Sequence, residues 1–122
     1  MLVAISIPIF TSQLEKAREA TDAANLRSAY AVASTAVLDG DGDTGYSAGP
    51  VKMTQTTAGF ASSGLKGQSI GGVALSSLTD AKTGVSYYVN VTTDGKVTIT
   101  TTSSGTVIDP VTGKAPTPTP KP

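Results

Sequence analysis

Residues 1–30, MLVAISIPIFTSQLEKAREATDAANLRSAY, decide the fold, because they open on a charge-free apolar run and contain no glycine. The apolar run covers 1–10 and is interrupted only by Ser6 and Pro8. As a helix it would be about 15 Å long, against roughly 30 Å of hydrocarbon in a bilayer. The run is therefore too short to span a membrane, which raises the question of what it packs against.

Residues 1–38 predict one long helix, since they are rich in alanine and lack glycine. We divide it into an apolar segment, 1–14, and an amphipathic segment, 15–38. Pro8 has no N–H for the Ala4 carbonyl and predicts a kink or a melted turn, while Ser12 and Glu15 resemble a capping box that would restart the helix. A stripe of small and apolar residues at helical spacing would allow close backbone approach, either to a sheet or to another helix: Leu14, Ala17, Ala20, Thr21, Ala24, Ser28, Ala31, Thr35 and Leu38.

Residues 39–72 predict a long loop between helix and sheet, because glycine recurs every few residues and no hydrophobic period persists. We expect this loop to wrap over the helix and to be held there by its larger apolar side chains: Tyr46, Val51, Met53, Phe60 and Leu65. At the other end of the chain, 109–122 predict an extended tail in which proline alternates with threonine.

Residues 73–108 predict a small antiparallel sheet, in which 73–78 form a short strand, 84–101 a hairpin and 106–108 a further strand. Apolar residues alternate on both arms of the hairpin, so the register decides whether they share a face. A two-residue loop would put the two apolar rows on opposite faces. A three-residue loop, 93–95, pairs Val91 with Val97 and Val89 with Ile99, and it places glycine at Gly95, where a left-handed residue is needed. We therefore predict the three-residue loop.

The composition excludes several classes of function. The chain has no cysteine and no histidine, which rules out disulfides, thiolate chemistry and imidazole catalysis. Nine basic and nine acidic residues balance, whereas a nucleic-acid binder needs a basic face. No catalytic constellation or phosphate-binding loop is present, so we expect neither an enzyme nor a nucleic-acid partner, and no organic cofactor.

Two short motifs invite a binding or modification site. Asp39, Asp41 and Asp43 match the first three ligand positions of an EF-hand, but Thr44 and Pro50 stand where glycine and glutamate are required. The favoured interpretation is a solvated acidic turn, with calcium as the alternative because carboxylates past a helix C-terminus would gain from a cation. The sequon at Asn90 is expected to be fortuitous, since it falls within a predicted strand.

The opening resembles the N-terminal segment of type IV pilins, especially those of Gram-positive bacteria. The apolar run ends in Ile-Pro-x-Phe at 7–10, a polar stretch with Glu, Lys and Arg follows, and EATDAANLRSAYAVA occupies 19–33. The resemblance covers 2–38, about a third of the chain. It implies an α+β pilin fold, with a long N-terminal helix packed on a small antiparallel sheet. It also implies that the front of the apolar helix is missing before Met1.

The function that the resemblance implies is that of a structural subunit of a type IV pilus-like cell-surface filament, serving adhesion, motility or surface colonisation. The partners would be other copies, minor pilins and, before assembly, the inner or cytoplasmic membrane. Alternatives are a pseudopilin of a type II secretion system, a competence pilus subunit and a tip-displayed adhesion module. The residues expected to drive assembly are Leu2, Val3, Ile5, Ile7, Pro8, Ile9, Phe10 and Leu14.

Overall fold

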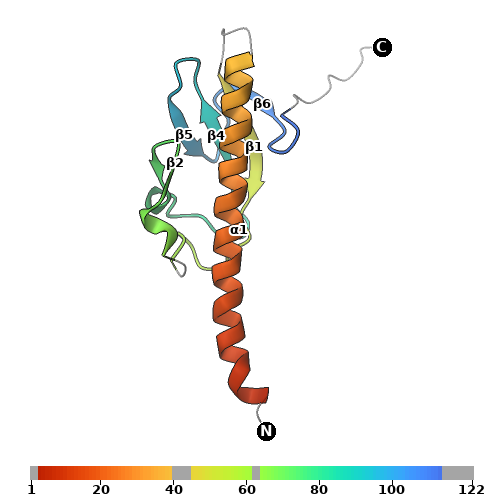
Figure 1. Ribbon diagram of the computed structural model, residues 1–122, viewed down its shortest axis with the longest axis vertical. Helices are drawn as coiled ribbons and strands as arrows, with labels where there is room; N and C mark the ends of the chain where they lie inside the picture. Colours follow the sequence, from red (N-terminus) through yellow and green to blue (C-terminus); the bar gives the residue numbers. More distant parts are fainter. Residues whose placement is uncertain (1–2, 40–44, 62–63, 114–122) are drawn as a thin grey trace, which may run out of the picture.

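One long helix packs along a four-stranded sheet, which confirms the predicted α+β class (Figure 1). The computed structural model describes residues 3–39, 45–61 and 64–113, with the side chains of the helix described from Gln13 onward. The helix is α1 (Val3–Asp39), and the main sheet has the order β5-β4-β1-β6. Its strands are β1 (Tyr46–Lys52), β4 (Ser86–Val91), β5 (Val97–Thr100) and β6 (Thr106–Ile108).

Helix α1 is continuous over 37 residues, so the predicted melted turn at 4–8 and the predicted restart near Ser12 are wrong. Pro8 removes one hydrogen bond from the helix. Because each further residue adds its own bond once a helix has formed, the long helical run from Ile9 to Asp39 outweighs that loss. The helix ends at Asp39, one residue beyond the predicted boundary.

The β4–β5 hairpin has the predicted register. Val91 pairs with Val97 and Val89 with Ile99. The Gly95 N–H donates to the Thr92 carbonyl at 3.0 Å, and Gly95 adopts a φ of 89°, as the three-residue loop requires. The alternation of apolar residues therefore fixed the loop length correctly, and both apolar rows face the helix.

The segment 39–72, predicted as a loop, contains strand β1, which lies inside the sheet between β4 and β6. It is antiparallel to β4 but parallel to β6, so the sheet is mixed and the purely antiparallel prediction is wrong. The sequence did not predict this strand because it contains Gly49 and Pro50, and glycine and proline are unusual in a central strand. The ladder to β4 absorbs them through a register shift between Ala48 and Val51.

The predicted strand at 73–78 is much shorter than expected. Only β3 (Val73–Ala74) is extended, and it pairs with β2 (Ser69–Ile70) in a separate ribbon rather than with the main sheet. Two short 3-10 helices, η1 (Leu65–Gly67) and η2 (Leu75–Ser77), flank this ribbon. The further strand predicted at 106–108 is confirmed as β6 (Thr106–Ile108).

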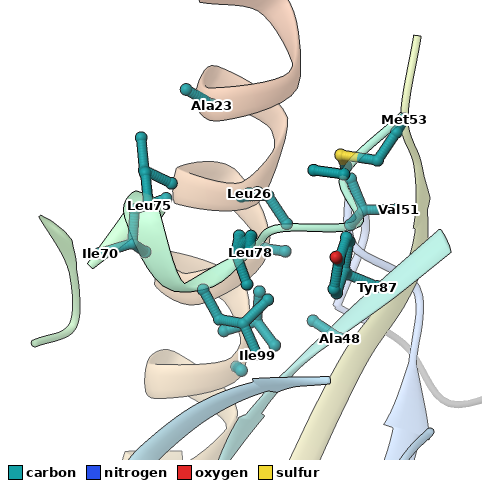
Figure 2. Packing of buried hydrophobic residues seen from close by; sticks show 14 of the residues in the cluster. Ala23, Leu26, Ala48, Val51, Met53, Ile70, Leu75, Leu78, Tyr87 and Ile99 are labelled. Atoms are coloured by element: carbon teal, nitrogen blue, oxygen red, sulfur yellow. The ribbon is translucent and has the colours of Figure 1, made fainter. Parts of the chain in front are cut away.

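The core lies between α1, the inner face of the sheet and the segments around the ribbon. Figure 2 shows Leu78 and Ile99 near the middle of the cluster, with Val51, Met53 and Tyr87 to one side. Helix α1 contributes mostly small residues, Ala23, Ala29 and Ala33, and one large one, Leu26, all fully buried. The five apolar anchors predicted for the loop all belong to this cluster or pack against it, as expected.

The β2–β3 turn offers a test of how closely the ribbon packs on the helix. A Cβ on Gly71 would lie 2.7 Å from Cε1 of Tyr30, whereas one on Gly72 would meet no atom within 4 Å. Both glycines have positive φ, so alanine at either position costs about 1–2 kcal/mol. We expect Gly71→Ala to lose roughly 1–3 kcal/mol more than Gly72→Ala, since it also overpacks the core. Urea unfolding of both variants measures this difference, and equal losses would contradict it.

Candidate assembly surface of helix α1

The two long faces of α1 differ in exposure, and the small-residue stripe is not the face that packs on the sheet. Every member of the stripe from Ala17 to Leu38 is exposed, and Leu14 is 36% exposed. The face that packs on the sheet and loops carries instead a run of carboxylates followed by alanines and a leucine: Glu15, Glu19, Asp22, Ala23, Leu26, Ala29 and Ala33. Leu26 supplies a large buried side chain to this face, whereas the stripe has only Ala24 and Ser28 at the same level of the helix.

The front of α1 extends beyond the rest of the protein as a single projecting rod (Figure 1). From Val3 to Leu14 it is helical, a length of roughly 18 Å at the rise of an α-helix. The predicted assembly residues Val3, Ile5, Ile7, Pro8, Ile9 and Phe10 all lie on this rod, and Leu2 falls outside the described residues. The helix backbone thus brings these residues together ahead of Glu15, the first buried side chain among the described residues of α1.

Asp22 anchors the segment after β1 to the helix. Its carboxylate, fully buried, accepts hydrogen bonds from the backbone N–H and hydroxyl of Thr54, at 2.9 and 2.7 Å. It also accepts from the backbone N–H and side-chain amide of Gln55, both at 3.0 Å. A buried carboxylate is stable only when its oxygens are satisfied in this way. Four donor groups on two consecutive residues therefore fix the loop to the helix.

Glu15 repeats this arrangement two turns earlier. Its oxygens accept from the backbone N–H of Thr56 at 2.9 Å, from the Thr56 hydroxyl at 2.7 Å and from the N–H of Thr57 at 2.8 Å. Arg18 lies 3.6 Å from Oε1 of Glu15 as an ion-pair partner, one helical turn away. Together, Glu15 and Asp22 bind four consecutive backbone N–H groups of 54–57. We call these two carboxylates and the segment 54–57 the carboxylate clamp.

The clamp also orders the residues that follow it. Gln55, fully buried, donates to Asp22 through its amide nitrogen and accepts from the Phe60 N–H through its amide oxygen, at 3.0 and 2.9 Å. Phe60 has a φ of 55°, which is uncommon for a residue with a side chain, and its ring is fully buried. The loop is thus held to α1 by polar contacts at one end and by an aromatic anchor at the other.

Sequence reasoning did not find the clamp. It placed Glu15 in a capping box with Ser12 and assigned no role to Glu19 or Asp22. The available signal was that Glu15, Glu19 and Asp22 share one helical face at spacings of four and three. Their partners form the segment TQTT at 54–57, which is rich in hydroxyl and amide donors. Nothing local links two such segments, because some forty residues separate Glu15 from Thr56.

The pKa of Glu15 makes the clamp dependent on pH. Burial opposes ionisation, but hydrogen bonds from Thr56 and Thr57 and the nearby Arg18 outweigh it and hold the pKa below its ordinary value of 4.5. A carboxyl with a lowered folded-state pKa adds stability above its unfolded pKa and loses it as pH falls through the folded one. The contribution of Glu15 should therefore be complete near neutrality and disappear below about pH 4.5.

We expect Glu15→Gln to be less stable than the wild type at pH 7 and the two to converge as pH is lowered below 4.5. Glutamine keeps the size of the side chain but cannot ionise, so only the wild type loses the charged acceptor. Urea unfolding at a series of pH values measures the convergence. Asp39→Asn serves as the matched control, because Asp39 is exposed at the end of the same helix. Curves for Glu15→Gln and the wild type that stay parallel would contradict the assignment.

The predicted calcium ligands fall largely outside the described residues. Asp39 ends α1 and is exposed, whereas Asp41 and Asp43 are not described. Among residues 3–39, 45–61 and 64–113, no group of three or more acidic, histidine or cysteine side chains is placed to hold a metal ion. The calcium interpretation therefore remains a sequence-based prediction.

The sequon asparagine is an internal structural residue. Asn90 is 2% exposed, and its amide nitrogen donates to the hydroxyls of Thr98 and Thr100 at 3.2 and 2.8 Å. Its amide oxygen accepts from the Ser47 hydroxyl at 2.5 Å, and that hydroxyl accepts from the Gly105 N–H. The nitrogen that a glycan would modify is thus occupied and covered in the folded protein, in agreement with the fortuitous interpretation.

Comparison with known proteins adds no family to this description. No protein-family model matches the chain, and no curated protein or solved structure matches it significantly. Within the described part of the chain, no helix combines the length and hydropathy that crossing a membrane requires.

Proposed function

We propose that this protein is a structural subunit of a type IV pilus-like cell-surface filament, which polymerises through its apolar N-terminal helix. The observation that carries the proposal is the projecting rod of α1. Helix α1 begins inside the apolar run of the sequence, at Val3, and continues for 37 residues without interruption, with the uncharged residues up to Leu14 ahead of the part that packs on the sheet. Apolar side chains such as those of this segment are unfavourable in water, and packing with copies of itself or with lipid would remove them from it.

In this proposal the protein acts by assembly rather than by catalysis. The rod packs among the rods of neighbouring copies, and the sheet and loops lie on the outside of the fibre. Before assembly, the rod and any segment that precedes it would lie in the cytoplasmic or inner membrane. The partners are other copies and minor pilins, and the filament serves adhesion, motility or surface colonisation outside the cell.

The carboxylate clamp supports this proposal mechanically. A subunit held in a fibre by its helix must transmit force from that helix to the rest of the protein. The clamp joins the helix to the segment after β1 at Glu15 and Asp22, just behind the rod. Charge-assisted hydrogen bonds of this kind are about twice as strong as neutral ones.

Electron microscopy of material sheared from the cell surface tests the proposal. Antibodies raised against the sheet domain should label the filaments along their whole length. Labelling only at filament ends would favour a minor or tip-displayed subunit, and short cell-bound fibres would favour a secretion pseudopilus. A subunit that is abundant on the cell but absent from every filament would overturn the proposal.

A further inference from the structure

An open hollow of about 590 Å³ lies where α1 meets β1, β6 and the turn after β6. We call it the α1–β6 hollow. Its walls are largely apolar and include Val32, Ala36, Tyr46 and Ile108. Among the described residues that line it, Asp39 alone is charged, and it lies exposed at the C-terminal end of α1, where the helix dipole adds negative potential. The hollow therefore combines apolar walls and an aromatic ring with a carboxylate.

The turn after β6 adds a second carboxylate beside this hollow. Asp109 is exposed and accepts from the backbone N–H groups of Thr112 and Val111 at 3.0 and 2.7 Å, and Thr112 itself lines the hollow. These hydrogen bonds lower the pKa of Asp109, so its carboxylate is charged at neutral pH. A lysine side chain suits such a site, because its stem packs on apolar surface, its ammonium group pairs with carboxylates and an aromatic ring attracts the cation.

A lysine of the required kind projects from the short helix η1. Lys66 is the central residue of η1 and is exposed. A Cβ built on Gly64 or on Gly67 would meet no atom within 4 Å, so the turn that carries Lys66 has open space on both sides. Within the described part of the chain, the ammonium group of Lys66 has neither a hydrogen bond nor an ion pair. It is therefore available to a partner outside the subunit.

Helix η1 and the hollow lie on different flanks of α1. Tyr30 faces the β2–β3 turn, since a Cβ on Gly71 would lie 2.7 Å from its ring, whereas Val32 lines the hollow. Two positions that are two residues apart point about 200° apart around a helix. Figure 1 shows the same division, with β2 on one side of α1 and β1 and β6 on the other. A subunit therefore cannot place Lys66 in its own hollow, and the lysine must come from another copy.

The two surfaces also lie at different levels along α1. Arg27 donates a hydrogen bond to the side chain of Gln68, the residue that ends η1, and so fixes the level of η1 on the helix. The hollow is lined by α1 residues from Ala31 to Asp39, with Thr35 at the middle of this range. The eight residues between Arg27 and Thr35 rise about 12 Å. A contact between two different surfaces that shifts each copy along the axis builds a helical filament rather than a closed ring.

From these observations we propose that Lys66 of one copy inserts into the α1–β6 hollow of the neighbouring copy. Its ammonium group lies beside Asp39 and Asp109, and its stem packs on Ala36 and Ile108. This is a second contact between copies, made by the folded domain rather than by the apolar rod. The inference rests on the filament proposal and names the surfaces through which neighbouring copies bind side by side.

Carbodiimide cross-linking of wild-type filaments tests the contact directly. The reagent activates a carboxylate, and a lysine amine in contact with it then displaces the activated group and forms an amide bond. Denaturing electrophoresis should show dimers and larger species. Mass spectrometry of their proteolytic peptides should join Lys66 to Asp39 or Asp109. Cross-linked species in which Asp39 and Asp109 are joined only to other lysines would overturn the assignment of Lys66.

Charge reversal tests the same contact through assembly. Lys66→Glu and Asp39→Lys each place like charges together and should lower filament yield roughly tenfold, which corresponds to about 1.4 kcal/mol. Co-expression of the two variants without the wild type should restore the yield, because each variant then meets its complement in the other. Lys96→Glu makes the same change at the exposed β4–β5 turn and should have no effect.

The outcomes separate this inference from the proposal on which it rests. Wild-type filaments that give no such cross-link, or single variants that assemble as well as Lys96→Glu, would overturn the Lys66 contact and leave the filament proposal standing. Co-expressed variants that assemble no better than either variant alone would also overturn the contact. A wild-type subunit that forms no filaments would overturn both. Thermal unfolding checks that each variant is folded, which we expect because Lys66, Asp39 and Lys96 are exposed.

Discussion

Replacing Asp22 with alanine is expected to lower the free energy of unfolding by roughly 3–4 kcal/mol. The carboxylate is fully buried and accepts from four donor groups of Thr54 and Gln55. Hydrogen bonds to a charged group contribute about 1.5–3 kcal/mol each, and a buried donor left without an acceptor costs a further 1–3 kcal/mol. Because the segment can relax toward water once released, the total loss is smaller than the sum of these terms.

Two further variants separate the clamp from a simple loss of packing. Asp22→Asn keeps the volume of the side chain but replaces one accepting oxygen with an NH₂ group, which then faces the donors of Thr54 and Gln55. We therefore expect it to lose at least about half of the free energy of unfolding that Asp22→Ala loses. Asp39→Ala removes the same side chain from an exposed site of the same helix, and changes of that kind fall within about 0.5 kcal/mol. Urea unfolding near pH 7 measures all three. A loss for Asp22→Ala as small as that for Asp39→Ala would show that the clamp does not stabilise the fold.

The parts of this fold that the sequence predicts are those set by local periodicity. Alternating valines on two arms, with glycine at one loop position, allowed only one register for the β4–β5 hairpin, and that register is present. The long helix was equally clear, because nothing in its composition except Pro8 opposes it. In both cases the deciding information lies within a few residues along the chain.

Strand β1 and the buried face of α1 could not be predicted in this way, because tertiary contacts decide them. Gly49 and Pro50 make β1 look like a loop, yet β4 and β6 pair with it on either side. On α1, the small-residue stripe and the carboxylate face are both compatible with helical spacing. The donors of 54–57 decide between them, since they satisfy Glu15 and Asp22 when these face inward. These hydrogen bonds join segments that are far apart in the sequence, so they form only when the chain has folded.

Introducing a carboxylate into the apolar rod should abolish filaments without unfolding the subunit. Ile7→Glu places a charge in the segment proposed to pack between copies, and a charge in such a setting costs about 3 kcal/mol or more. Since every 1.4 kcal/mol changes an equilibrium constant tenfold, the concentration needed for polymerisation should rise at least about 100-fold. Filament yield is measured by shearing, sedimentation and electron microscopy.

The folded state of the variant should be unchanged, because Ile7 precedes Glu15, the first residue of α1 described as buried. Thermal unfolding of the sheet domain checks this, and the amount of subunit in the membrane fraction shows whether the charge instead blocks insertion. Ile7→Val preserves an apolar side chain and should assemble normally. Thr93→Glu adds the same charge at the exposed β4–β5 turn and should also leave filaments intact. Normal filament yield from Ile7→Glu would mean that the rod is not the assembly surface, because a helix packed among its copies leaves an added carboxylate no route to water.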